Sequence, residues 1–541
     1  MTGKGSLFEF YHTVIIGEML LIFFAFAQTS TPLSATCHGG VCPSLGVRTD
    51  TAPTVPAGLP KRSEAGVGAL FPWANKLYMV TYLSVPQYGA GAGLYEIDED
   101  MSITKIKNHS GVFANRMIHH WTDSAIIGPY VIDQFGGVRT ITDLLLVRIG
   151  AMAEHLFHPE TMVYMVSMDG PLYEVDLTTL QARQIANLVD ELDIPISPDP
   201  HTTGQCYPHF KDALTVHATA DGKGGVTNAS AGGILYVVSN GYNEADFVNG
   251  SNCGRLASWN GAVGKKQWNV LSTTAHYGLA ARKNYGRVTY ATGWDRKSAI
   301  LSTRDMGSAD APTLDNGWKT LRLPKASHAF DHGWQTEWPR IREVETERYL
   351  LDVHGMFYEL SPLGWAASTF GVRPICQHLR VIPDFTTFRG LLVMGGNEGS
   401  SIFDNNIVTG QAQSGLWLGK TDDLWGWGKP QGWGSVFLEE PLRQGQASDP
   451  MLMTGFDHKV VHLSIDSSNT TERVRLAIEL DTLGTALRTG RWRRVAVVEL
   501  NFNVALSAYK PYVFEEGMTA HWARVVALDA CDMCTATFMY T

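Results

Sequence analysis

The chain has 541 residues, of which 44% are hydrophobic and only 18% are charged, so it is not a largely disordered protein. One ordinary core does not extend to this length, and we expect either several domains or a repeat architecture. The formal net charge of −10 argues against non-specific binding to nucleic acid or to an anionic membrane. The 54 glycines and 15 tryptophans favour an all-β protein with many turns and short strands.

The N-terminus has the pattern of a secretory signal peptide. Lys4 precedes an apolar run, and Ala25 and Ala27 form a small-residue cleavage site. The alternative is a membrane anchor, but the apolar stretch is about 14 residues long, whereas a spanning helix needs about 20. We predict a signal peptide over residues 1–27 and a secreted, extracellular protein that has no membrane contact once the peptide is removed.

Glycosylation sequons and cysteines fit an exported protein. The four sequons begin at Asn108, Asn228, Asn249 and Asn469. Among the seven cysteines, Cys37 with Cys42 and Cys531 with Cys534 are spaced to close small loops in an oxidising compartment. An odd count leaves at least one thiol free, and the other pairings stay open.

The middle of the chain contains recurring short strands. Residues 28–62 are rich in Ser, Thr, Pro and Gly and predict a flexible lead-in. From residue 63 onward variants of one strand recur, such as residues 170–176 (GPLYEVD) and 355–360 (GMFYEL). Their spacing indicates units of about 56 residues, and seven four-stranded units over residues 63–460 would form a β-propeller. Two stacked β-sandwiches are the alternative.

The remaining segments complete the expected organisation. Residues 461–541 contain longer alternating strands, which predict a small C-terminal β domain. Only residues 179–192 have a pattern compatible with a helix. The predicted fold class is therefore all-β: a seven-bladed β-propeller with a small C-terminal β-sandwich-like segment.

Candidates for proton transfer lie in two segments. His119 ends an apolar run, and a histidine serves as general acid or base near neutral pH. Its neighbour His120 would face the other side of a strand, because successive side chains alternate. Tyr207 and His209 lie in a polar loop and are further candidates. The alternative for each histidine is a hydrogen-bonded structural role.

Arg340 and Arg342 alternate along a predicted strand and would share one face. Two guanidinium groups in this arrangement suit a carboxylate, which arginine binds through bidentate hydrogen bonds. The alternative is an Arg–Glu ladder with Glu337 and Glu343.

Three more residues are candidates for substrate binding. His354 precedes one of the recurrent strands, and Trp417 and Lys420 lie in a segment rich in tryptophan. Tryptophan rings stack on sugar faces, although packing at a blade edge is an equally open role for them.

Several of these segments together resemble a known enzyme family. They are residues 116–119 (RMIH), 126–130 (IIGPY), 336–344 (TEWPRIREV), 354–359 (HGMFYE) and 415–425 (GLWLGKTDDLW). They look like the L-rhamnose-α-1,4-D-glucuronate lyases, which are seven-bladed propellers of fungi and gut bacteria. The chain departs from the family's pattern after His119, where His120 and Trp121 follow in place of a polar run.

The resemblance implies a lyase that removes terminal rhamnose from glucuronate in acidic plant polysaccharides of the gum arabic type. In this β-elimination a base takes the C5 proton, a cation neutralises the uronate carboxylate, and rhamnose leaves from C4. The family's key histidine would be His119, and family members hold calcium in the central channel, with ligands that this sequence does not reveal. A monomer is expected. The alternatives are a noncatalytic glycan- or protein-binding propeller and a glycoside hydrolase.

Overall fold

The computed structural model describes residues 44–48, 64–83, 93–107, 115–196, 206–217, 233–241, 253–281, 288–305, 317–326, 339–344, 348–360, 371–378, 382–399, 413–466, 473–485, 491–501 and 507–541. The predicted signal peptide, the four sequons, Cys37, Cys42 and Glu337 lie outside these residues. Within them the structure is all-β, as predicted. Its helices are α2 (Leu188–Glu191) and the 3-10 turns η1 (Thr142–Leu144) and η2 (Thr421–Gly426).

Antiparallel sheets made of consecutive strands follow one another along the chain. The first contains β2 (Glu64–Trp73), β3 (Lys76–Leu83), β4 (Leu94–Ile97) and β5 (Ile103–Lys107), with β28 (Asn397–Gly399) beside β2. The next contains β6 (Arg116–His119), β7 (Ser124–Ile127), β8 (Tyr130–Asp133) and β9 (Val138–Thr140). It is followed by β10 (Ile149–Glu154), β11 (Met162–Ser167), β12 (Pro171–Asp176) and β13 (Ala182–Asn187).

The pattern continues through the middle of the chain. One sheet contains β14 (Phe210–His217), β15 (Gly233–Ser239), β16 (Arg255–Trp259) and β17 (Asn269–Ser272). The next begins with β18 (Ala275–Ala281), β19 (Val288–Trp294), β20 (Ala299–Asp305) and β21 (Trp318–Leu323). Another contains β22 (Arg340–Val344), β23 (Arg348–Val353), β24 (Met356–Leu360) and β25 (Arg373–Gln377).

The last sheet of this series contains strands from both the N-terminal and the C-terminal end of the series. Its strands are β26 (Phe385–Phe388), β27 (Leu391–Gly395), β29 (Gln413–Gly419) and β1 (Ser44–Arg48). Strand β1 pairs antiparallel with β29, with Gly46 opposite Gly415. The expectation of a flexible lead-in is therefore wrong for residues 44–48, because the open edge of β29 gives this segment a hydrogen-bonding partner.

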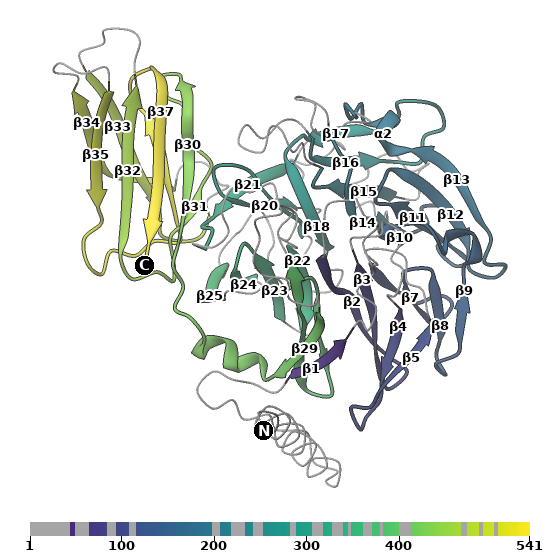
Figure 1. Ribbon diagram of the computed structural model, residues 1–541. Coiled ribbons are helices and arrows are strands. Elements are labelled where there is room, and N and C mark those ends of the chain that lie inside the picture. The colour runs from purple at the N-terminus through teal and green to yellow at the C-terminus, as the bar shows by residue number, and fades with distance from the viewer. Residues whose placement is uncertain are drawn as a thin grey trace, which may run out of the picture.

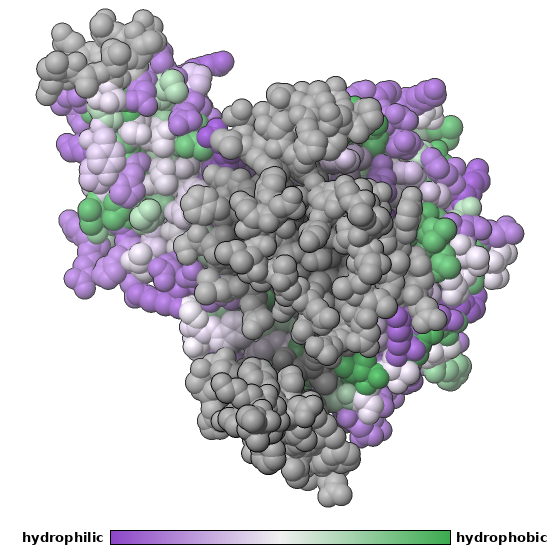
Figure 2. Space-filling view, viewed as in Figure 1, coloured by the Kyte–Doolittle hydropathy of each residue, from purple (hydrophilic) through white to green (hydrophobic). Residues whose placement is uncertain are grey.

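The sheets are packed face to face around a common centre, in a propeller-like arrangement (Figure 1). Ile127 of β7 packs with Val80 of the preceding sheet, whereas its neighbour Ile126 packs with Met165 of the following one. Both faces of such a strand are buried, which explains why its sequence is a continuous apolar run. Figure 2 shows polar residues along the visible outer edges of the described part, with apolar residues between them.

Two further groups of paired strands are built from the C-terminal part of the chain (Figure 1). One contains β30 (Gly432–Leu442), β37 (Cys531–Tyr540), β32 (Lys459–Asp466) and β35 (Ser507–Val513). The other contains β31 (Met451–Leu452), β36 (Trp522–Ala527), β33 (Arg473–Asp481) and β34 (Arg493–Asn501). A shared core that includes Leu463, Ile478, Trp522 and Phe538 lies between them.

The C-terminal sheets are joined directly to the sheet of β18–β21. Strand β31 pairs in parallel with β21 through Arg322 and Met451. The Arg322 guanidinium bonds Asp295 and Asp449, each at 3.0 Å. These two carboxylates raise the pKa of Arg322, although burial alone would lower it. A boundary at residue 461 would separate β30 and β31 from their partners β37 and β36, so the pairing favours a boundary near residue 430.

The expected helix over residues 179–192 is wrong for most of its length. Residues 182–187 form β13, in which Arg183 lies opposite Glu174 of β12. Only α2 is helical, and the Asn187 side chain caps it by accepting a hydrogen bond from Val189 N at 3.1 Å. Pairing with an available sheet edge outweighed weak local helix preference here.

Removing β1 should destabilise the series of sheets. We expect a protein that begins after residue 48 to lose about 2 kcal/mol relative to one that begins after residue 28, because each ladder hydrogen bond contributes about 1 kcal/mol net. Urea unfolding of the two proteins measures the difference. Equal midpoints and slopes would show that β1 contributes nothing to the closed arrangement.

Candidate functional site

Asp384 is the most connected carboxylate at the centre of the sheets. It is fully buried, and it accepts hydrogen bonds from Leu70 N (2.9 Å), Arg342 Nε (2.7 Å) and Arg116 Nε (3.4 Å). Burial would raise the pKa of Asp384, but the arginines lower it to about 2. The carboxylate is therefore ionised at any ordinary pH.

Arg116 and Arg342 share this carboxylate and crowd each other. Burial and the nearby Arg342 charge lower the pKa of Arg116 to about 10, so it still carries its proton at neutral pH. Burial also opposes the charge of Arg342, but Asp384 outweighs it and raises the pKa of Arg342. Within the described part of the chain, Nη2 of Arg342 is buried and has no hydrogen-bond partner.

Arg340 lies next to this pair and contacts an aromatic ring. Its Nε donates to Pro383 O at 3.0 Å, and its guanidinium lies 4.9 Å from the ring centre of Tyr277. Lys211 Nζ lies 5.5 Å from the same ring centre. Two cations thus contact one buried ring, an arrangement in which each is attracted to the ring face.

β-Bulges shape this part of the centre. The register of β14 against β15 shifts at Lys211, and the register of β18 against β19 shifts at Tyr277. A bulge leaves one residue out of the ladder and redirects its side chain, and such bulges are common beside functional sites.

Asp212 is the second carboxylate of the cluster. It accepts from Asn115 Nδ2 at 2.6 Å and from Leu279 N at 2.8 Å. Burial raises the pKa of Asp212 in spite of the charges of Arg340 and Arg342, which lower it.

The channel cluster, as we call it, has more positive than negative groups. Its charged members among the described residues are Arg116, Lys211, Arg340, Arg342, Asp212 and Asp384. Among the described residues, four cations lie near two carboxylates. Arginine and lysine bind anions through charge-assisted hydrogen bonds, so the channel cluster is a candidate site for an anionic ligand.

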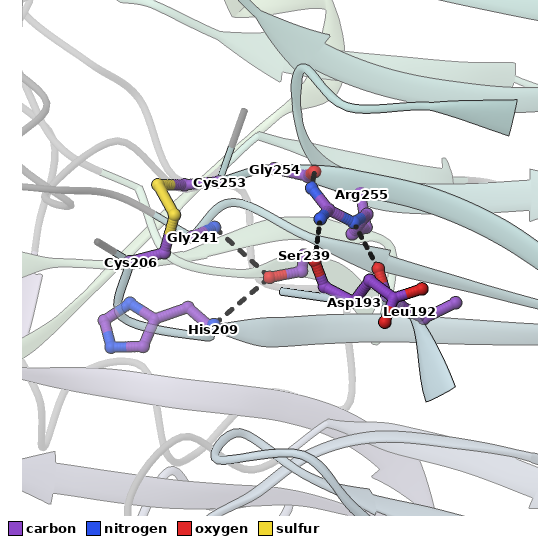
Figure 3. The surroundings of a disulfide bond; sticks show 9 residues. All are labelled: Leu192, Asp193, Cys206, His209, Ser239, Gly241, Cys253, Gly254 and Arg255. Atoms are coloured by element: carbon purple, nitrogen blue, oxygen red, sulfur yellow. Dashed lines mark hydrogen bonds between the residues drawn. A yellow bond between two sulfur atoms is a disulfide. The ribbon is translucent and has the colours of Figure 1, made fainter. Parts of the chain in front are cut away.

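Tyr207 and His209 immediately precede β14. Figure 3 shows His209 near the disulfide of Cys206. Cys206 is bonded to Cys253, which fixes this segment against the start of β16. The backbone N of His209 donates to Ser239 Oγ at 3.1 Å, and Gly241 N donates to the same oxygen at 3.2 Å. His209 is two residues before Lys211, about 7 Å along a strand. His209 is thus close in the chain to the channel cluster, although it precedes β14.

His119 lies at the opposite end of its strand. Arg116 begins β6 at the channel cluster, whereas His119 ends it, about 10 Å further along. Its Nε2 donates to Pro159 O at 2.6 Å, and its Nδ1 accepts from Thr122 Oγ1 at 2.7 Å. Burial lowers the pKa of His119, so the ring is neutral with both nitrogens engaged. These contacts are those of a structural histidine.

His354, Trp417 and Lys420 lie outside the channel cluster. His354 forms the β23–β24 turn with Gly355, both at positive φ, and its ring packs on Trp294 with centroids 5.3 Å apart. Trp417 packs edge-to-face on Trp427 at 5.1 Å. Lys420 is exposed and follows β29 at the end of the sheet opposite Asp384. Of the predicted binding residues, the structure brings only Arg340 and Arg342 together.

The hydrogen bonds of these arginines in the described structure include one from Arg342 to Asp384 and one from Arg340 to Pro383 O. Sequence reasoning missed Asp384, Arg116 and Tyr277. Arg116 stands in the segment RMIH that was singled out in the sequence, but nothing local to Asp384 indicates its distant partners.

Other kinds of site find little support in the described residues. They contain no group of three or more His, Cys, Asp or Glu that would hold a metal ion. The surplus of positive charge in the channel cluster also does not suit calcium. No helix among them is long and apolar enough to cross a bilayer.

No protein-family model matches the chain, and no curated protein matches it. Among solved structures it is similar to the WD40 repeats of RRP9, at 8% identity and a TM-score of 0.35 over 69% of this chain and 97% of that one. It is also similar to a chain of the Mitotic Checkpoint Complex, at 10% identity and a TM-score of 0.36 over 72% of this chain and 100% of that one. A third similar structure is the Cps50 (Swd1) β-propeller domain of Myceliophteria thermophila, at 12% identity and a TM-score of 0.35 over 69% of this chain and 99% of that one. Scores this low carry no argument about this chain.

Asp384 should stabilise the fold in a pH-dependent way. Its pKa of about 2 lies below the ordinary 3.8, so the ionised form stabilises the fold above about pH 4 and this contribution, about 2 kcal/mol, is lost as the pH falls towards 2. We expect Asp384→Asn to cost about 3 kcal/mol near neutral pH, because it leaves buried arginines unpaired, and to flatten the acid dependence. Urea unfolding from pH 6 to pH 2 measures both effects.

Asp422 is the matched control, because its side chain is 82% exposed and pairs with Arg348 on the surface. Asp422→Asn should change stability by less than about 0.5 kcal/mol. If Asp384→Asn behaved like Asp422→Asn, the buried ion pairs would not stabilise the fold.

Proposed function

We propose that the described sheets are the blades of a seven-bladed β-propeller. The support is the order in which their first strands contact one another. Strands β2, β6, β10, β14, β18, β22 and β26 are neighbours in that sequence, and β26 contacts β2. These strands then surround a central channel, with β1 completing the last blade, and the C-terminal sheets are an added domain that begins near residue 430.

We further propose that the protein is a secreted carbohydrate-active lyase that acts on a uronate-containing glycan, with rhamnosyl-glucuronate ends of acidic plant polysaccharides as substrate. The observation that carries this proposal is the channel cluster. Its arginines and its lysine suit the carboxylate of a uronic acid, and an oriented guanidinium binds a carboxylate through two hydrogen bonds. The resemblance of segments such as residues 336–344 to the rhamnose–glucuronate lyases supports the same substrate.

Elimination requires that the acidic C5 proton be made easier to remove. A cation against the uronate carboxylate stabilises the negative charge that develops next to C5 when the proton leaves. Arg342 offers the spare Nη2 for this contact, and Arg340 lies beside it. The electron pair from C5–H then forms the C4–C5 double bond as the bond from C4 to rhamnose breaks.

We propose His209 as the proton-transfer residue, with Tyr207 as its neighbour in the site. The support is its position: His209 immediately precedes β14, two residues before Lys211 of the channel cluster. His119 is assigned a structural role because both its ring nitrogens are engaged and it lies at the far end of β6.

Secretion is proposed on the N-terminal sequence and on the disulfides. Cys206–Cys253 and Cys531–Cys534 are both formed, the second as the spacing predicted. Structural disulfides persist in oxidising compartments. Of the described cysteines, the buried Cys376 is free.

A single assay tests the reaction class. Purified protein incubated with gum arabic should release rhamnose and at the same time produce the ultraviolet absorbance of a C4–C5 unsaturated uronate. Rhamnose release without absorbance would identify a hydrolase instead. Binding of the polysaccharide with neither signal would identify a glycan-binding protein.

The arginines should be sensitive to conservative replacement. We expect Arg340→Lys and Arg342→Lys each to lower kcat/KM at least about 10-fold, because a lysine ammonium loses the bidentate geometry. Initial rates from the ultraviolet assay measure this effect. Arg348→Lys is the control, because Arg348 contacts Glu359, Asp422 and the ring of Trp425, none of which belongs to the channel cluster, and its replacement should leave kcat/KM unchanged. Equal losses in all three variants would remove the channel cluster from the site.

The two histidines give the sharpest test of the proton-transfer assignment. We expect His209→Ala to lower kcat at least about 100-fold, the low end for a general acid or base, with little change in melting temperature. His119→Gln should have the opposite profile: a lower melting temperature with kcat reduced less than about 5-fold, since its bonds to Pro159 and Thr122 are structural. A large loss of kcat in a folded His119→Gln protein would return the catalytic role to His119.

A further inference from the structure

Asn240 is a buried polar residue that no internal contact explains. It follows β15 and is 2% exposed. Its backbone N donates to His209 O at 3.1 Å, which holds it against the start of β14. Its side-chain Nδ2 and Oδ1 are both buried, and neither has a hydrogen-bond partner in the described structure.

An amide in this state is costly to the fold. It has lost its hydrogen bonds to water and gained none from the protein, so it carries the full desolvation penalty. A buried asparagine is ordinarily bonded, as Asn115 shows at similar burial: its Nδ2 donates to Asp212 and its Oδ1 accepts from Arg116 N. A residue left unsatisfied in a folded protein calls for a role outside the fold.

The surroundings of Asn240 indicate that role. Ser239 next to it accepts from His209 N and Gly241 N, and the Cys206–Cys253 disulfide joins the segment before His209 to the segment before β16 (Figure 3). The backbone that carries the Asn240 amide is thus fixed beside the backbone of His209. The amide offers one donor group and one acceptor, which is what a sugar hydroxyl requires, because a hydroxyl both donates and accepts.

We propose that Asn240 binds a hydroxyl group of the sugar whose carboxylate is held by the channel cluster. This inference rests on the proposed function. It divides recognition into two parts: the arginines bind the charge of the uronate, and Asn240 binds a ring hydroxyl. A ligand hydroxyl that satisfies a buried amide contributes to specificity, since an analogue without it leaves the amide unpaired.

The test variant is Asn240→Leu, which keeps the shape of the side chain and removes both polar groups. Its melting temperature should rise by at least about 1 °C, because an unsatisfied amide is replaced by an apolar group. The matched variant Asn115→Leu should lower the melting temperature, because its amide is bonded. A fall for Asn240→Leu as large as that for Asn115→Leu would overturn the inference, since it would mean that the Asn240 amide is already satisfied.

Binding is measured with two small probes, D-glucuronate and cyclohexanecarboxylate, by NMR titration. The second probe has the ring and the carboxylate but no hydroxyl groups. Asn240→Leu should weaken glucuronate binding about 10-fold or more and leave cyclohexanecarboxylate binding unchanged. Arg340→Lys should weaken both.

The outcomes separate the inference from the proposed function. If the parent protein binds glucuronate and Asn240→Leu binds it equally well, the inference is overturned and the proposed function stands. If the parent protein binds neither probe and no acidic oligosaccharide, the proposed function is wrong. The assignment of Asn240 is then wrong as well, because it depends on that function. Asn240→Ala gives the same binding comparison should the leucine not be accommodated.

Discussion

The buried carboxylate of Asp384 is the interaction on which the centre of the molecule depends. It joins β2, β6 and β22 to the segment before β26, and its bond to Leu70 N connects residues 314 positions apart. Without it, Arg116 and Arg342 would repel each other in a desolvated space. A single ionised group therefore holds together the first strands of sheets from both ends of the series. It also fixes the direction in which the Arg342 guanidinium points.

The same interaction explains how several arginines can be buried near one another. Asp384 stays ionised and pairs with Arg116 and Arg342. Lys211 and Tyr277 are added to this centre by bulges, which displace one residue from the ladder without breaking the sheet. Because Arg116 and Arg342 share Asp384, a substitution at one of them is expected to affect the other.

Much of the strand content could be predicted, because the strands carry their own pattern. Residues 170–176 were identified as a recurrent strand, and residues 171–176 form β12. The alternation of Arg340 and Arg342 placed both on one strand, where they reach Pro383 and Asp384. What failed or was missed depends on contacts between distant residues. Residues 182–187 became β13 because β12 offered an edge, and β1 found its partner nearly the whole length of the sheet series away. His119 could not be placed on the far end of β6 from its sequence, and nothing near Asn240 shows that its amide lacks a partner.

The pairing of β1 with β29 has a consequence for biosynthesis. Ser44 lies opposite Trp417, so the partner of the first described strand is synthesised 373 residues after it. At 5–20 residues per second this delay is roughly 20 to 75 s. During that time the N-terminal strand and the edges of the growing sheets have no permanent neighbour, and unpaired edges invite association with other chains. The pairing of β1 with β29 is therefore a late event in the synthesis of the chain, and until then the edge of β29 is open to other strands.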